Sequence, residues 1–199
     1  MNFSDQPHGA TPLDHEDRLG LIPTGIKTRQ LLNQLEAKNI VHAQIWVASQ
    51  KWDTSKLLTS AMMRRTHREM FGEVWSWAGK FRSRETTIGI APEQIGVGTE
   101  QLMGNIGFQV VGAKSTQSKR HIIANLHHQL VKIHLFPNGN GRHARLICDV
   151  FSQCLEIETP QWNGQNLIDQ EESRNLYLQS LRHADKTGTL GPLIEFMWK

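Results

Sequence analysis

Apolar residues recur every three or four positions along most of the chain, which is the spacing of an amphipathic helix. The first stripe begins near Lys27, where Thr24 or Thr28 can serve as the N-cap, and includes Leu31, Leu35 and later residues. The predicted helical segments are 27–47, 57–71, 122–133, 146–155, 176–181 and 192–198. This pattern predicts a mainly α fold.

Two segments break the helical pattern before the motif region. Residues 1–26 contain three prolines and no apolar stripe, which predicts an irregular N-terminal arm. Residues 80–98 mix Thr, Ile and Val with Gly and Pro at turn spacing, which predicts a short β-hairpin or ordered flap. Because no repeat or linker divides the rest, we expect one domain over residues 1–199, with its core at about 27–199.

Composition narrows the class of protein. The chain has 199 residues, of which 38% are hydrophobic and 21% charged, as in folded soluble domains and unlike disordered chains. The two cysteines, Cys148 and Cys154, are six apart in a predicted helix and point to different sides, so they cannot form a disulfide. With no apolar run long enough for a membrane span and no basic, apolar leader, we expect a cytoplasmic protein without a membrane partner.

Charge is unevenly distributed along the chain. The formal net charge is only +3, too small to indicate a nucleic-acid-binding protein. Between Glu100 and Asp149, however, there is no carboxylate side chain. That stretch contains Lys114, Lys119, Arg120, Lys132, Arg142 and Arg145 together with five histidines. It is either a solvated basic face balanced by acidic residues folded over it or a site for an anion, and the glycines within it favour an anion.

Residues 134–145, HLFPNGNGRHAR, place a glycine-rich turn between two predicted helices. Gly139 and Gly141 can adopt positive φ, so successive N–H groups can form an anion-binding nest at the next helix's N-terminus. Arg142 and Arg145 are three apart on that helix and share a face, from which they can hold phosphate oxygens. His134, with an ordinary pKa near 6.5, is mostly neutral at pH 7 and can accept a hydroxyl proton. The combination predicts phosphoryl or nucleotidyl transfer.

The same residues closely resemble the signature of the Fic (Fido) family, HxFx(D/E)GNGRxxR. Residues 71–82, FGEVWSWAGKFR, are similar to the family's segment leading into the flap, and residues 177–196 resemble its C-terminal end. The opening residues 9–23 and 31–40 further resemble the subgroup called mobile mystery protein B. The resemblance implies a helical Fic-type domain with a small β-hairpin flap.

The resemblance implies a protein adenylyltransferase, which transfers AMP from ATP to a Ser, Thr or Tyr hydroxyl of a target protein (AMPylation) and releases pyrophosphate. His134 would be the general base, and Arg142 and Arg145 would hold the outer phosphates. The anion hole would be formed by Gly139, Asn140 and Gly141, and the target segment would pair with a flap strand at Thr86, Thr87, Ile88 and Gly89. A regulatory partner resembling mobile mystery protein A is implied, and direct nucleic-acid binding is not expected.

One position departs from the family pattern. Asn138 stands where the family has Asp or Glu, the carboxylate that would anchor the Mg²⁺ (or Mn²⁺) bridging the ATP phosphates. An amide oxygen can ligate Mg²⁺ but brings no charge, and Mg²⁺ prefers anionic oxygen. We therefore expect weaker metal binding and slower transfer.

Many Fic proteins carry an inhibitory helix with the pattern (S/T)xxxE(G/N), whose Glu pairs with the second motif arginine, here Arg145. No clean copy is present: residues 32–37, LNQLEA, offer Glu36 without the hydroxyl residue, and residues 152–157, SQCLEI, lie in the active-site helix itself. Glu36 is expected to be an exposed helical charge rather than an inhibitor, and inhibition by a partner protein stays open.

Four alternatives remain. Asn138 favours a catalytically weakened, Fic-like nucleotide-binding or toxin-type protein, and a transferase with another phosphate-linked donor is also open. A binding module for nucleotide or RNA through the basic stretch is disfavoured because no basic and aromatic residues alternate as on single-strand platforms. A metal hydrolase is disfavoured because His127, His128 and His134 lack the HExxH pattern.

Overall fold

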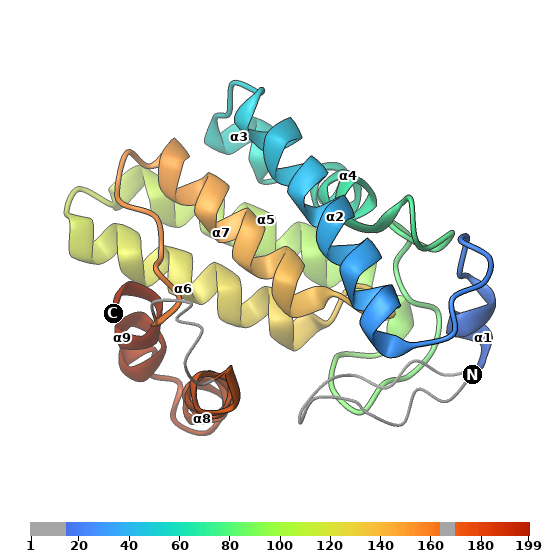
Figure 1. The fold of residues 1–199 in the computed structure, drawn as a ribbon. Helices are drawn as coiled ribbons and strands as arrows, with labels where there is room; N and C mark the ends of the chain where they lie inside the picture. The colour runs from blue at the N-terminus through green and yellow to red at the C-terminus, as the bar shows by residue number, and fades with distance from the viewer. Residues whose placement is uncertain (1–14, 164–169) are drawn as a thin grey trace.

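The computed structural model describes residues 15–163 and 170–199, and these form a bundle of α-helices (Figure 1). The helical elements are α1 (His15–Leu19), α2 (Arg29–Ala48), α3 (Thr54–Leu57), α4 (Ser60–Phe71), η1 (Pro92–Gln94), α5 (Ile95–Gly112), α6 (Thr116–Ile133), α7 (Asn140–Cys154), α8 (Gln170–Thr187) and α9 (Gly191–Trp198). The predicted mainly α class is confirmed. Of the two candidate N-caps, Thr28 is the one that caps α2: its side-chain oxygen accepts the Leu31 N–H at 3.2 Å.

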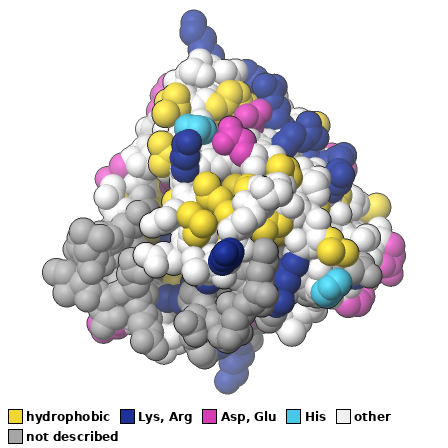
Figure 2. Space-filling model, turned by 45° about the vertical axis from the view of Figure 1, so that its right-hand side comes forward, with side chains coloured by type: hydrophobic (Ala, Val, Ile, Leu, Met, Phe, Trp, Pro, Cys, Tyr) yellow, Lys and Arg dark blue, Asp and Glu magenta, His cyan; other side chains and the backbone are white. Residues whose placement is uncertain are grey.

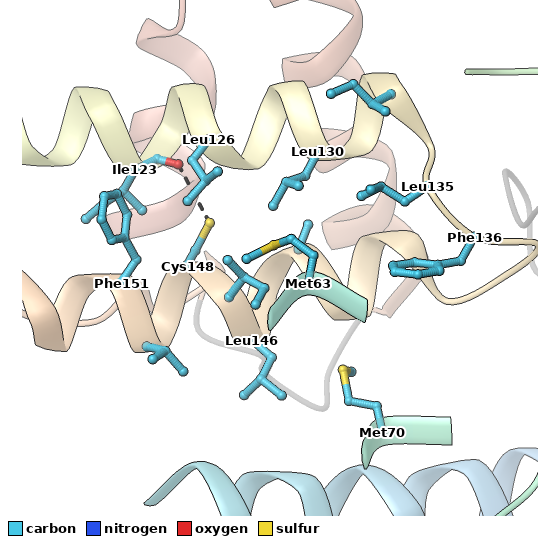
Figure 3. Close-up of a cluster of buried hydrophobic side chains, with 14 of the residues drawn as sticks. Met63, Met70, Ile123, Leu126, Leu130, Leu135, Phe136, Leu146, Cys148 and Phe151 are labelled. Atoms are coloured by element: carbon cyan, nitrogen blue, oxygen red, sulfur yellow. Dashed lines mark hydrogen bonds between the residues drawn. The ribbon is translucent and has the colours of Figure 1, made fainter. Parts of the chain in front are cut away.

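The helices α6 and α7 lie side by side at the centre of the molecule. Helix α5 packs on α6, α2 packs on α4, and α8 and α9 pair with each other beside α6 (Figure 1). The core lies where α4, α6 and α7 meet, and Met63, Leu126 and Phe151 are fully buried in it (Figure 3). Burying each such side chain stabilises the fold by roughly 1.5–3 kcal/mol. The core therefore holds rigidly the two helices that the glycine-rich turn connects.

Both cysteines are free thiols, as the spacing predicts. Cys148 is buried in the core, and its thiol lies 3.6 Å from the Ile123 carbonyl oxygen (Figure 3). Burial raises the pKa of this thiol well above its ordinary value, with Asp149 adding to the shift. A thiol held protonated in this way is a packing group rather than a nucleophile.

The segment predicted as a β-hairpin is instead a loop followed by helix. Residues 81–91 form no strand, residues 92–94 form η1, and α5 begins at Ile95. The one β-bridge among the described residues joins Leu21 to Trp75. The hairpin prediction is therefore wrong, and its last residues belong to a helix that periodicity did not indicate.

Helix α5 forms despite five glycines between Gly96 and Gly112. Glycine lowers helix propensity, but the buried residues of α5 recur on one face and pack on α4 and α6. These residues are Ile95, Thr99, Leu102, Met103 and Ile106. Tertiary packing thus outweighs local propensity here.

The described part of the expected irregular arm contains the short helix α1, while residues 1–14 lie outside the described residues.

The surface is mixed in charge on the face that Figure 2 shows. Lys and Arg side chains there alternate with acidic and hydrophobic ones among the described residues, and they do not merge into one basic surface. Within residues 15–163 and 170–199, no helix is both long and apolar enough to cross a membrane.

Burial lowers the pKa of His67, His127, His134 and His143, which are among the buried histidines of the bundle. The pKa falls to about 3 for His127 and to about 4 for His134 and His143, and it falls well below its ordinary value for His67. For three of them a neighbouring side chain lowers the pKa further: the guanidinium of Arg145 for His127, that of Arg82 for His134, and the imidazole of His143 for His67. These imidazoles are therefore neutral in the folded protein at neutral pH.

We predict that the protein loses stability as the pH falls below about 6.5. Between roughly pH 4 and 6.5 the unfolded chain binds protons that the folded chain excludes, so each histidine contributes a slope of about 1.4 kcal/mol per pH unit. Burial raises the pKa of Asp149 to about 6, and its protonation offsets part of one such slope. Urea unfolding at about pH 7.5 and about pH 5 measures the effect, and an unchanged midpoint would contradict it.

Candidate functional site

The glycine-rich turn lies between α6 and α7, as the sequence predicts. Helix α6 ends at Ile133 and is followed by the C-cap His134, which has a left-handed φ of 57°, and α7 is preceded by Gly139, with a φ of 80°. A Cβ on Gly139 would lie 2.6 Å from the Phe71 ring, so this position requires glycine for both its backbone and its packing. The turn places His134 and the N-terminus of α7 at the same end of the bundle.

Asn140 braces this turn from within. Its side-chain oxygen accepts the Phe136 N–H at 2.9 Å, and its side-chain nitrogen donates to the Phe136 carbonyl at 2.7 Å. The side chain is therefore committed to the loop, and a role for Asn140 in anion binding is left to its backbone N–H. Because the first N–H groups of a helix have no intrahelical acceptor, residues 140–142 present donors at a positive helix end.

His134 is a neutral base held in the wall of the site. Only 4% of its surface is exposed, and it sits at the C-cap of α6. Burial lowers its pKa to about 4, the positive charge of Arg82 lowers it further, and a backbone hydrogen bond at Val131 opposes these effects. A neutral imidazole in this place can accept a proton from a hydroxyl at neutral pH.

Arg82 holds the flap segment against the motif, and the sequence analysis did not single it out. Its guanidinium is buried and donates to four backbone carbonyls, including those of His134 at 2.6 Å and Arg84 at 2.8 Å. The other two acceptors are the carbonyls of Ile90 and Ile133. The N–H groups of one guanidinium thus hold the flap segment in place of the cross-strand hydrogen bonds that a hairpin would need. An isolated arginine in a loop gives no periodic signal, so only the structure reveals this function.

The flap approaches His134 most closely at Gly89. This residue has a φ of 120°, and a Cβ there would lie 2.8 Å from the His134 Cβ and would collide with the Arg82 guanidinium. Thr86, Thr87 and Pro137 line one open pocket of about 620 Å³ together with Arg84 and Trp77. Two of the four predicted flap residues therefore border a cavity beside the motif turn.

Arg142 is engaged by an acidic residue from another helix. Its guanidinium lies 2.7 Å from the Glu36 carboxylate and 4.8 Å from the centre of the Phe71 ring. Glu36 is only 3% exposed and also accepts the Trp75 indole N–H at 2.7 Å. The expectation that Glu36 is an exposed charge is therefore wrong. It lies in the site and pairs with the first motif arginine rather than with Arg145.

Asn138 points toward the same guanidinium. Its side-chain oxygen accepts from Arg142 at 3.3 Å, a long hydrogen bond. Among the described residues no group of three or more His, Cys, Asp or Glu side chains is placed to hold a metal ion. An uncharged oxygen beside a guanidinium is a poor ligand for Mg²⁺, so the residues around Asn138 do not make a metal site that fits the ion.

Arg145 lies between two aromatic rings. Its guanidinium is 4.9 Å from the centre of the Tyr177 ring and 5.3 Å from that of the Trp162 ring. Tyr177 is buried on α8 and its hydroxyl is 2.9 Å from His127 Nε2. Arg174, one turn earlier on α8, is close enough for Arg145 to lower its pKa, after the larger effect of burial. The structure thus adds residues of α8 to a site that the sequence predicts from the motif and the flap.

The comparisons with known proteins agree with this geometry. The model of the Fic/DOC family matches residues 57–152. No curated protein matches the chain in sequence. The solved structures similar to it include the BepC effector of Bartonella tribocorum with bound AMPPNP, at a TM-score of 0.72 and 17% identity over 92% of this chain and 96% of that one.

Two further solved structures illustrate the range of the similarity. The N-terminal Fic domain of a Bartonella quintana effector with bound ADP has a TM-score of 0.67 at 17% identity, covering 87% of this chain and 86% of that one. Fic-1 from C. elegans has a TM-score of 0.68 at 19% identity, covering 90% of this chain and 51% of that one. The fold is therefore that of a Fic domain. The family resemblance of the motif is confirmed, and this chain carries a Fic/DOC domain.

We predict that Glu36→Gln raises the affinity for ATP by about tenfold, equivalent to about 1.4 kcal/mol. The glutamine keeps an oxygen for Trp75 but removes the negative charge beside Arg142, which is 41% exposed and can turn to a phosphate. Calorimetric titration with ATP measures the change. Glu100→Gln, at an exposed position of α5, is the matched control. A lower affinity in Glu36→Gln would show that Glu36 orients Arg142 instead of competing with the nucleotide.

We predict that Gly89→Ala destabilises the fold by about 1–3 kcal/mol more than Gly25→Ala. Both glycines have positive φ, but a Cβ on Gly25 meets nothing within 4 Å, whereas one on Gly89 meets Arg82 and His134. Gly25→Ala therefore measures a substitution at positive φ that meets no steric contact. Urea unfolding of both variants measures the difference, and equal losses of stability would show that the flap does not pack closely on Arg82 and His134.

Proposed function

We propose that this protein is an adenylyltransferase that moves AMP from ATP to a hydroxyl group of a target protein. The observation that carries the proposal is the buried, neutral His134 beside a positive helix end that also bears Arg142 and Arg145. The reaction requires a general base and a set of hydrogen-bond donors and positive charges that binds the triphosphate, because its catalysis rests mainly on positioning and charge stabilisation. The nucleotides bound in the BepC and Bartonella quintana structures, AMPPNP and ADP, support a nucleotide as the donor.

In the proposed reaction His134 accepts the proton of the attacking hydroxyl. The hydroxyl oxygen forms a bond to the α-phosphorus, and the bond from that phosphorus to the bridging oxygen of the β-phosphate breaks. Pyrophosphate leaves with the electron pair of that bond. The N–H groups at the start of α7 stabilise the charge that develops on the α-phosphate, and the two arginines hold the outer phosphates.

The acceptor is proposed to be a protein segment lying along the flap. In the described structure the backbone N–H groups of residues 85–89 make no hydrogen bond to another backbone carbonyl. The Arg82 guanidinium fixes both ends of this stretch, because it donates to the carbonyls of Arg84 and Ile90. Two backbone hydrogen bonds hold the same ends against the motif region: the Arg82 N–H donates to Leu135, and the Ile90 N–H donates to Ile133. A segment with available main-chain donors and fixed ends can pair with an extended peptide by adding a strand.

A second candidate function is a nucleotide-binding protein of this fold with little or no transfer activity. The contact between Asn138 and Arg142 favours this second function. At the position where the family has its metal-anchoring carboxylate, this chain has an uncharged oxygen that already accepts a hydrogen bond from an arginine. The two functions share the nucleotide site and differ only in turnover, so a single transfer assay separates them.

We predict that label from α-labelled ATP is transferred to protein in a host lysate with Mg²⁺ or Mn²⁺, and that His134→Ala abolishes the transfer while retaining ATP affinity. Asn138→Asp should increase the rate, because it supplies an anionic oxygen for a nucleotide-bound cation. The matched controls are His121→Ala on α6 and Asn105→Asp on α5, both at exposed positions.

Each outcome of this assay decides between the two functions. Transfer that persists in His134→Ala would remove His134 as the base. ATP binding without transfer in the wild type, with a gain in Asn138→Asp, would establish the second candidate function. ATP binding with no transfer by any variant would leave only nucleotide binding.

A further inference from the structure

His67 on α4 lies directly beneath the motif turn, although no feature of the sequence singled it out. Its side chain is fully buried, and its ring stacks on Phe136 at a centroid distance of 3.7 Å. Its two nitrogens have different partners. The Gly79 N–H donates to Nδ1 at 3.0 Å, and Nε2 lies 3.0 Å from the Asn138 carbonyl oxygen. The imidazole therefore joins the end of the 71–79 segment to the turn.

These partners determine the tautomer. Because Nδ1 accepts a hydrogen bond from a backbone N–H, the ring proton must be on Nε2, which then donates to the Asn138 carbonyl. A second proton on Nδ1 would face the Gly79 N–H. Burial, then the nearby His143 and Arg142, lower the pKa of His67 well below its ordinary value, against the opposing effect of the Asn138 hydrogen bond. The ring is consequently a neutral donor toward the turn.

The hydrogen bond to Asn138 orients the next N–H. The described chain has no cis peptide bonds, so the carbonyl of Asn138 and the N–H of Gly139 point in opposite directions. The carbonyl is directed inward at the buried imidazole, and the Gly139 N–H is therefore directed away from the core. Residues 138 and 139 are partly exposed, so this N–H faces the side of the turn that a ligand can reach.

We propose that His67 is a positioning residue, which holds the Asn138–Gly139 peptide so that the Gly139 N–H adds to the anion-binding donors at the start of α7. The inference rests on the proposed function only in that the turn binds phosphate. His67 touches no reacting group and acts through the peptide that it orients. The His67 ring also packs closely under the turn: a Cβ on Gly139 would lie 3.4 Å from Nε2.

Two variants separate the two hydrogen bonds of His67. In His67→Asn the amide oxygen is placed where Nδ1 was and can accept the Gly79 N–H, but no donor reaches Asn138. In His67→Gln the amide nitrogen is placed where Nε2 was and can donate to Asn138, but the Gly79 bond is lost. Both variants remove the ring that stacks on Phe136, so each is the control for the other in stability.

The test compares the affinity of the wild type and both variants for ATP and for pyrophosphate, with urea unfolding of all three proteins. We expect His67→Asn to lose about tenfold or more in affinity and His67→Gln to stay within about threefold, at similar losses of stability. In transfer assays the same order should appear in KM, because the donor acts on the bound phosphate.

A second readout reports the tautomer directly. Nitrogen NMR of the wild type should show His67 protonated on Nε2 and unprotonated on Nδ1 near neutral pH, and the Gly139 amide signal should move more in His67→Asn than in His67→Gln. The opposite tautomer, equal affinity losses in the two variants, or unchanged affinity in both would overturn the inference.

Failure of the proposed function gives a different result. A wild type that binds ATP but transfers nothing removes the transferase and leaves the affinity test of His67 intact. A wild type that binds neither ATP nor pyrophosphate removes the anion site, and the inference about His67 is overturned with it.

Discussion

The site depends on the need to satisfy backbone polar groups in a turn that is packed into the core. The stretch from Leu135 to Gly139 leaves helical geometry between α6 and α7, so most of its N–H and C=O groups have no intrahelical partners. Three buried side chains replace those partners: Asn140 for Phe136, Arg82 for Ile133 and His134, and His67 for Asn138. With inward groups satisfied, the outward N–H groups remain for a ligand.

Electrostatics at the same end of the bundle is balanced rather than simply positive. Arg142 pairs with the buried carboxylate of Glu36, and Glu36 is held by the indole of Trp75. A buried carboxylate requires such partners, because removing it from water is costly without them. Arg145 has aromatic rings on two sides instead. The first motif arginine is thus engaged within the protein, and the second lies against the rings of Tyr177 on α8 and Trp162, which precedes that helix.

Most of the helices could be predicted because apolar periodicity directly reflects one buried face. Helix α5 could not, because its glycines lower local propensity and its stability comes from packing on α4 and α6. The expected hairpin failed for a related reason. Thr and Ile alternate with turn residues there, but the loop is anchored by the guanidinium of Arg82, a contact that crosses about fifty residues to reach Ile133 and His134.

The sequence by itself determined the motif, its position between two helices and the residue types available for chemistry, because these are local and contiguous from His134 to Arg145. Only the tertiary structure decided which of these groups are engaged and how they are charged. The pairing of Glu36 with Arg142 and the support of Asn138 by His67 join residues 106 and 71 positions apart. Contacts at such separation leave no periodic trace in a single sequence, and they arise when α2 and α4 pack around the turn.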